Sequence, residues 1–289
     1  MTDVPVEEVA VAAPKKESGG FPLPKFLKPN ATVSAMTQTF ITIGWIAALL
    51  AGWFFLSAGE GEASIVRLLP SPGETFAAFL VQWQQGAVFE MMTSLMISIE
   101  SILWAAVLGL GASYLATIAG FKPPVWLWGY LRFLSLTGVL IFFILATNGD
   151  GHRLKVAVLT FAITTFLVAE MMTTIANIPE TKFDHARTLG LNRLQVLREV
   201  VIRGTLAQAL DSLRGNAAMA WMMLTMVEGL SRSEGGIGVL LLNLNRMQNW
   251  EAILAIQIMI LIVGIGQDTA LRFAKSVICP YTRRDSTVA

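Results

Sequence analysis

Charged residues are scarce in this chain of 289 residues: they make up 14% of it, whereas soluble domains carry about 25%. Hydrophobic residues account for 54%, and the mean hydropathy is +0.61. So apolar a composition indicates that most of the chain lies in lipid. The formal net charge is only +1, so the composition gives no global basic field for nucleic acid, and we predict no nucleic-acid partner.

Residues that carry catalysis or bind metals are also few. Cys279 is the single cysteine, which excludes an intramolecular disulfide and a CxxC site. His152 and His185 are the only histidines, so we predict no metal site. The sequence lacks the GxxxxGK[ST] phosphate loop, the nucleophile elbow of serine hydrolases and the HExxH helix. We therefore predict no catalytic residues and no cofactor in this chain.

Long apolar runs dominate the rest of the sequence. A helix of roughly 20 apolar residues can cross a bilayer because it satisfies its own backbone hydrogen bonds. Six runs qualify, and we predict spans at 36–58, 92–119, 126–147, 154–178, 216–230 and 252–273. The fold class is therefore an all-α polytopic membrane protein. A flexible tail at 1–35 precedes the transmembrane domain 36–275, and a C-terminal tail follows at 276–289.

Basic residues indicate how these spans are oriented, because Lys and Arg gather in short cytoplasmic loops. The tail lysines, Lys122, the arginines of 182–203 and the basic C-terminal end agree with an even number of spans and two cytoplasmic termini. The segments 59–87 and 231–251 are then external. Arg153 and Lys155 disagree, because this topology places them outside.

The apolar pattern is interrupted at 180–206, where we predict two short amphipathic helices joined at Gly190. Apolar residues recur at helical spacing in both halves, at Phe183, Ala186 and Leu189 and then at Leu194, Leu197 and Val201. Gly190 is a natural helix end because glycine adopts the left-handed C-cap without steric cost. Such a pair offers a small knob to a partner protein. An amphipathic segment that lies on anionic lipid is the alternative.

This segment resembles the EAA loop of ABC importer permeases, in which Glu-Ala-Ala is followed by three residues, Gly, nine residues and Ile-x-Leu-Pro. Asp184, His185 and Ala186 stand at the first three positions, and Gly190 follows at the family's spacing. Val200 and Ile202 occupy the Ile and Leu positions, whereas His185 replaces an alanine and Arg203 the proline.

Further segments between 65 and 275 resemble the nitrate, sulfonate, taurine and bicarbonate group of these permeases. They are 69–72, 186–190, 212–214, Glu228 and the run Gly235-Gly236-Ile237-Gly238. The stretch 132–139 departs from the group because it lacks the group's prolines.

The resemblance implies a permease subunit in the bacterial inner membrane that is not itself an enzyme and passes a small solute, such as nitrate, bicarbonate, taurine or another sulfonate. ATP and Mg²⁺ would bind to separate ABC ATPase subunits. These subunits would contact Phe183, Asp184, His185, Ala186, Leu189 and Gly190. A second permease copy, forming a homodimer, and an external solute-binding protein complete the implied assembly. A secondary transporter or a channel-like protein that works without an ATPase is the alternative.

Polar residues within the spans are candidates for the translocation path. An ionised carboxylate in lipid costs about 3 kcal/mol, so it normally faces water or the bundle interior. We predict a path lined by Glu100, Glu170, Glu228, Ser94, Ser98 and Thr164. A carboxylate at the membrane interface and helix-to-helix hydrogen bonds of Ser and Thr are the alternatives. Asp268 and Arg272, four residues apart, are predicted to form an intrahelical ion pair.

The topology leads to a first prediction. Cysteines introduced at Ser18 and Ser286 should resist an impermeant thiol reagent in intact cells, because the basic segments place both termini in the cytoplasm. The measurement is labelling of intact against permeabilised cells. Labelling of either position from outside would overturn the six-span topology.

Overall fold

The structure, a computed structural model, describes residues 35–57, 70–118, 120–231 and 235–280. The tail predicted at 1–35 lies outside them except for Ala35, and so does most of the tail predicted at 276–289. The chain forms two units, 1–60 and 61–289. The described part of the first is the helix α1 (Ala35–Ser57). Its segment Met36–Ser57 has a mean hydropathy of 1.9, which suits a membrane span.

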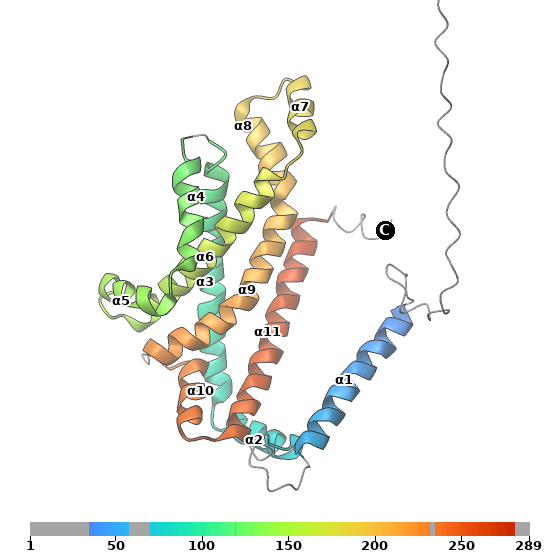
Figure 1. Ribbon diagram of the computed structural model, residues 1–289, viewed down its shortest axis with the longest axis vertical. Coiled ribbons are helices and arrows are strands. Elements are labelled where there is room, and N and C mark those ends of the chain that lie inside the picture. Colours follow the sequence, from blue (N-terminus) through green and yellow to red (C-terminus); the bar gives the residue numbers. More distant parts are fainter. Residues whose placement is uncertain (1–34, 58–69, 119, 232–234, 281–289) are drawn as a thin grey trace, which may run out of the picture. The chain divides into compact units, whose positions relative to one another are not determined.

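Four long helices lie side by side in the second unit: α3 (Ala87–Leu115), α6 (Gly151–Ala176), α9 (Arg203–Ser231) and α11 (Trp250–Ile278) (Figure 1). At one end lie α2 (Pro72–Gln84) and α10 (Ile237–Arg246), and at the other α7 (Glu180–Thr188) and α8 (Arg193–Val196). The helices α4 (Lys122–Tyr130) and α5 (Leu136–Ala146), joined by the 3₁₀ turn η3 (Leu131–Phe133), pack on α6. The π-helical segment η4 (Leu197–Ile202) connects α8 to α9.

Close packing of α3 on α6 forms the centre of this unit. Small residues recur along the buried face of α3, at Ser94, Ser98, Ser101, Ala105 and Gly109. In a membrane, the hydrophobic effect does not drive two helices together, so their association depends on close van der Waals packing. Small side chains allow this close approach. A Cβ atom on Gly109 would lie 2.7 Å from a methyl group of Leu167 in α6. Ser94 and Ser98 therefore belong to a packing face.

The prediction of six spans is not confirmed. In the described part of the chain, four helices are long and apolar enough to cross a membrane: α1, α3, α6 and α11. The third predicted span is a bent pair of helices, with 114° between Lys122–Phe133 and Leu136–Ala146, so the count is five if this pair crosses once. The bend occurs where Leu134 and Ser135 adopt extended backbone. The apolar composition of 126–147 concealed it.

The fifth predicted span, 216–230, is the C-terminal half of a longer helix. α9 has 29 residues, but it is not among the helices that are apolar enough to count as spans. Its charged residues, Arg203, Asp211, Arg214 and Glu228, account for this. The predicted second helix of 180–206 continues through η4 into α9 without a loop. The all-α fold class is confirmed for the described residues, which form helices, turns and loops.

Gly238 allows α10 to fold back against α9. A Cβ atom at this position would lie 2.3 Å from the carbonyl oxygen of Thr225 and 2.8 Å from its Cα atom. Both atoms belong to the backbone of α9, so no side-chain rotation can relieve the clash. The close approach of the two helices therefore requires glycine here.

Replacement of Gly238 by alanine should destabilise the fold by about 2 kcal/mol, the usual cost of overpacking a tight contact. The measurement is the thermal unfolding midpoint of the purified chain in detergent. Gly266→Ala in α11 is the matched control, because a Cβ atom there meets nothing within 4 Å. Equal midpoints for the two variants would contradict the close α9–α10 contact.

Candidate functional site

Glu228 lies fully buried beside the start of α10. Its carboxylate accepts hydrogen bonds from the backbone N–H of Gly238 (2.8 Å) and from the hydroxyl of Ser94 (2.7 Å). The Ser94 oxygen in turn accepts from the N–H of Ile237 (3.0 Å). The first N–H groups of a helix have no partner within it, and negative charge is favoured beside them. Glu228 and Ser94 thus cap α10 and tie it to α9 and α3.

The turn before α10 is held in the same way. Glu90 of α3 accepts from the N–H of Gly236, and the buried Lys155 of α6 donates to the carbonyl of Gly235 (2.8 Å). Gly235 and Gly236 have φ angles of 70° and 111°, which other residues rarely adopt. A Cβ atom on Gly236 would also lie 2.5 Å from the carboxylate of Glu228. Because these glycines have no side chain, the backbone of 235–238 lies close enough to bond to the carboxylates of Glu90 and Glu228.

Lys155 explains part of the disagreement in the charge pattern. α6 begins at Gly151, so Lys155 is a helical residue with an exposed fraction of 0% rather than part of an external loop. Its ammonium group serves a backbone carbonyl inside the protein. Arg153 is exposed and lies 3.4 Å from Asp150, the N-cap of the same helix. Of these two residues, Arg153 alone is an exposed charge that disagrees with the predicted topology.

Glu100 and Thr164, two of the residues predicted for the path, line one cavity of about 460 Å³ between α3, α4, α5 and α6. A carboxylate oxygen of Glu100 lies 2.9 Å from Nε2 of His152, and both side chains are nearly half exposed. The other walls are largely aromatic and include Trp104, Trp128, Phe143 and Phe161. The cavity therefore joins one polar pair to an aromatic surface.

Two polar atoms on the walls of this cavity have no protein partner among the described residues. They are the hydroxyl of Thr164, which is 1% exposed, and the indole N–H of Trp128. A buried donor without a partner costs free energy, so such groups normally bind water or a ligand. With the Glu100–His152 pair, they give the cavity the polar groups needed to orient a small solute.

The other predicted path residues lie elsewhere. The side-chain N–H of Gln267 donates to the hydroxyl oxygen of Ser98 (3.1 Å), and its side-chain oxygen accepts from the indole N–H of Trp221 (2.7 Å). Glu170 accepts from the side-chain amide of Asn216 (3.1 Å). These contacts link α3 to α11 and α6 to α9. Whether these residues also meet a solute stays a prediction.

The chain reverses at Gly190, between α7 and α8. Gly190 has a φ of 68°, its N–H donates to the carbonyl of Arg187 (2.9 Å), and the N–H of Leu191 donates to that of Ala186 (3.2 Å). These two bonds form a Schellman motif, in which a left-handed residue ends a helix. Asn192 then caps α8 in a capping box with Gln195. The short helix α7 and the reversal at Gly190 are present, whereas the predicted second helix continues through η4 into α9.

Not all the residues that the resemblance assigns to the ATPase contact are exposed. Ala186 is 2% exposed, and α7 packs on η4, so Ala186 lies within the chain's own interior. Leu189 and Leu194, in contrast, are 64% and 79% exposed on either side of Gly190. Phe183 is half-buried, and Asp184 and His185 are exposed. The residues that remain free to contact a partner are therefore at the tip.

Sequence reasoning missed His152 and Lys155 as members of these sites. Lys155 bonds to a glycine far away in the chain, which helical spacing cannot reveal. His152 lies in the first turn of α6 and is 52 residues from Glu100 in the chain, so the sequence pattern does not reveal their contact. The ion pair predicted for Asp268 and Arg272 is confirmed, at 2.9 Å.

Comparison with known proteins gives two relatives. No family model matches the chain. It is 29% identical over 99 residues to a protein of Methanocaldococcus jannaschii named as an ABC transporter permease, a match that covers 34% of this chain and 37% of that protein. It is 22% identical over 255 residues to the taurine transport system permease protein TauC of Escherichia coli, covering 84% of this chain and 90% of TauC.

Among solved structures, the chain is similar to that of the MetNI methionine ABC transporter in inward facing conformations. The sequence identity is 17% and the TM-score 0.47, over 66% of this chain and 93% of that one.

Replacement of Glu100 by glutamine should reduce solute uptake roughly tenfold, because a charge-assisted hydrogen bond to His152 is lost while the shape of the side chain is kept. The measurement is uptake into cells, with the protein level checked separately. Glu251→Gln, at an exposed carboxylate in the first turn of α11, is the control. Normal uptake by Glu100→Leu would show that the cavity is not part of the path.

Proposed function

Because the chain is an ABC transporter permease subunit, we propose that it forms the translocation path of an importer and that the segment 180–206 couples it to an ATPase. Hydrolysis of ATP, with Mg²⁺, takes place on that separate subunit. Both termini are cytoplasmic in this proposal, and the membrane is a bacterial inner membrane.

The observation that carries the coupling role is the exposed apolar tip around Gly190. α7 is a polar helix, with an ion pair between Arg187 and Asp184 (2.8 Å) on its surface. Apolar Leu189 and Leu194 nevertheless remain exposed on both sides of the turn. Exposed apolar groups rimmed by polar ones are typical of protein contact sites. A tip of this kind fits a groove on the ATPase.

The helical path from this tip supports transmission of force. α8, η4 and α9 follow one another without a break from Arg193 to Ser231. A displacement of the tip therefore moves α9, whose far end is bonded to α3 and α10 through Glu228. Closure of the ATPase pair would press two such tips together and rock the helices between inward-open and outward-open states.

The further partners follow from the same proposal. A second copy of the chain pairs with the first around one path, since closed two-fold symmetry is the commonest arrangement of identical subunits. A solute-binding protein delivers the solute on the outside. The solute is a small anion or a sulfonate such as taurine, a choice supported by the similarity to TauC of the taurine transport system.

Two substitutions at the tip test the coupling role. Leu189→Asp should weaken retention of the ATPase at least tenfold, because it buries an unpaired charge in the contact. Gly190→Val should act through the backbone, since a β-branched residue resists the φ of 68°. The measurements are ATPase retention on purification and ATPase activity in nanodiscs, with the permease level recorded.

Arg193→Ala is the control, because this exposed residue at the start of α8 forms no ion pair within the described residues. Ala186→Asp gives a different result, because Ala186 is buried in the chain itself. It should lower the amount of folded permease. If Leu189→Asp and Gly190→Val both keep a bound, substrate-stimulated ATPase, the coupling proposal is wrong and a lipid-surface role for 180–206 is favoured.

A further inference from the structure

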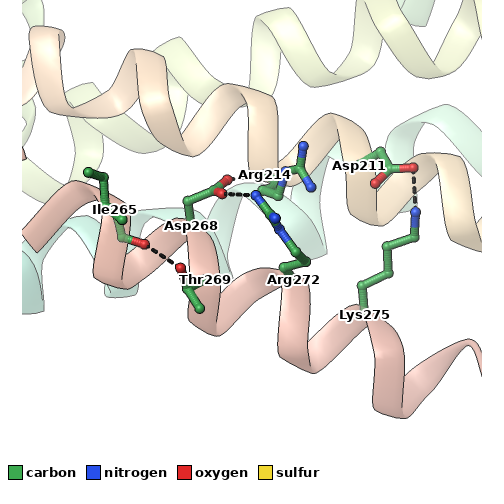
Figure 2. A network of polar contacts seen from close by, with 7 residues as sticks. All are labelled: Asp211, Arg214, Ile265, Asp268, Thr269, Arg272 and Lys275. Carbon is green, nitrogen blue, oxygen red and sulfur yellow. Dashed lines mark hydrogen bonds and ion pairs between the residues drawn. The ribbon is translucent and has the colours of Figure 1, made fainter. Parts of the chain in front are cut away.

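A second cavity, of about 590 Å³, lies between α9 and α11 and contains more basic than acidic groups. Arg214 of α9 and Arg272 of α11 both contact Asp268, at 3.1 Å and 2.9 Å (Figure 2). One carboxylate thus serves two guanidinium groups, which leaves one positive charge uncompensated. The side chains of Arg214 and Asp268 are 36% and 37% exposed and that of Arg272 is 65% exposed, so an anion can reach the uncompensated guanidinium group.

Donors remain available on both arginines. Nε of Arg214 and one terminal nitrogen of Arg272 face Asp268, and within the described part of the chain these guanidinium groups have no other hydrogen-bond partner. A guanidinium has five N–H donors in a planar fork, which matches the oxygens of carboxylate, sulfonate and phosphate groups. The pair can therefore bind an anion between α9 and α11.

The neighbouring ion pair provides a contrast. Lys275 of α11 lies 2.6 Å from Asp211 of α9, one cation for one anion (Figure 2). This pair also joins the two helices, but it does not line the cavity. Joining α9 to α11 thus does not by itself require the excess charge found at Asp268.

The rest of the cavity suits the organic part of a solute. Trp221 and Gln267 form part of its lining, and their mutual hydrogen bond of 2.7 Å satisfies both groups. Ala217, Ala218 and Gly264 make the wall small and apolar. Its volume lies within the range of about 300–1,000 Å³ typical of small-molecule pockets.

We propose that this cavity binds an oxyanion, a sulfonate or phosphate group held between Arg214 and Arg272 in competition with Asp268. Two sources carry this chemistry: a solute in transit and the headgroup of an anionic lipid. The solute source rests on the proposed function. Binding itself requires neither ATP nor the tip at Gly190, so it can be measured independently of coupling.

The test measures binding of radiolabelled sulfate and of methanesulfonate to the full-length chain in phosphatidylcholine nanodiscs, without ATP. Arg214→Gln and Arg272→Gln should each weaken binding about tenfold, the usual consequence of losing one charge-assisted contact. Asp268→Asn should strengthen binding, because it removes the competing carboxylate. A purely structural ion-pair cluster would not yield a gain of affinity. Lys275→Gln, which removes an equal charge from the same two helices, is the matched control and should bind like the parent chain.

A second arm identifies the source. If a lipid headgroup can occupy the site, phosphatidylglycerol in the nanodiscs should reduce the binding of sulfate and methanesulfonate. The amount of phosphatidylglycerol retained on purification should then be lower in the two arginine variants. Anion binding in phosphatidylcholine alone supports the solute source, and arginine-dependent retention of phosphatidylglycerol without it supports the lipid source. If neither anion nor lipid depends on Arg214 and Arg272, or if Lys275→Gln has the same effect, the proposal is wrong. If Leu189→Asp and Gly190→Val keep a bound, substrate-stimulated ATPase while anion binding still depends on Arg214 and Arg272, the coupling proposal alone is wrong.

Discussion

The absence of water in a bilayer obliges each backbone N–H and C=O group to find its partner inside the protein. Within a helix, the backbone groups pair with one another. The first N–H groups and the last C=O groups of each helix have no such partner and must find one elsewhere. At the start of α10, the carboxylates of Glu90 and Glu228 and the hydroxyl of Ser94 take the first N–H groups. At the end of α7, in the segment proposed to lie outside the membrane, two local backbone bonds around Gly190 pair the last carbonyl groups. The start of α10 also connects segments distant in the sequence, so satisfying its backbone groups holds α10 against α3 and α9.

The sequence allowed the long helices and the break at Gly190 to be predicted, because apolar runs and a glycine at a helix end act locally. It did not reveal the bend at Leu134 and Ser135. No proline or glycine stands there, and the run remains apolar on both sides. The extent of α9 was also missed, since its charged residues lower the hydropathy without interrupting the helix.

The candidate site was predictable only in part, for a related reason. The argument that an intramembrane carboxylate faces a polar environment applies to Glu100 and to Glu228 alike. It does not distinguish a carboxylate on a cavity wall, as at Glu100, from one that caps a helix, as at Glu228. Their partners, His152 and the glycine turn, come from distant parts of the chain. Only the packing of α3 against α6 and α9 brings them together.

α9 connects all of these features. It follows the tip at Gly190 through α8 and η4, carries Arg214 at the α11 cavity, and has Glu228 in its last turn beside α10. Arg214 reaches Asp268 across the α9–α11 contact, so a shift of α9 along α11 changes how the carboxylate is shared between the two arginines. If the proposed rocking moves α9 in this way, the anion affinity of that cavity differs between its two positions. By linkage, an anion that binds one position more tightly also favours that position. A solute at Arg214 and an ATPase at the tip would thus influence each other through one rigid helix.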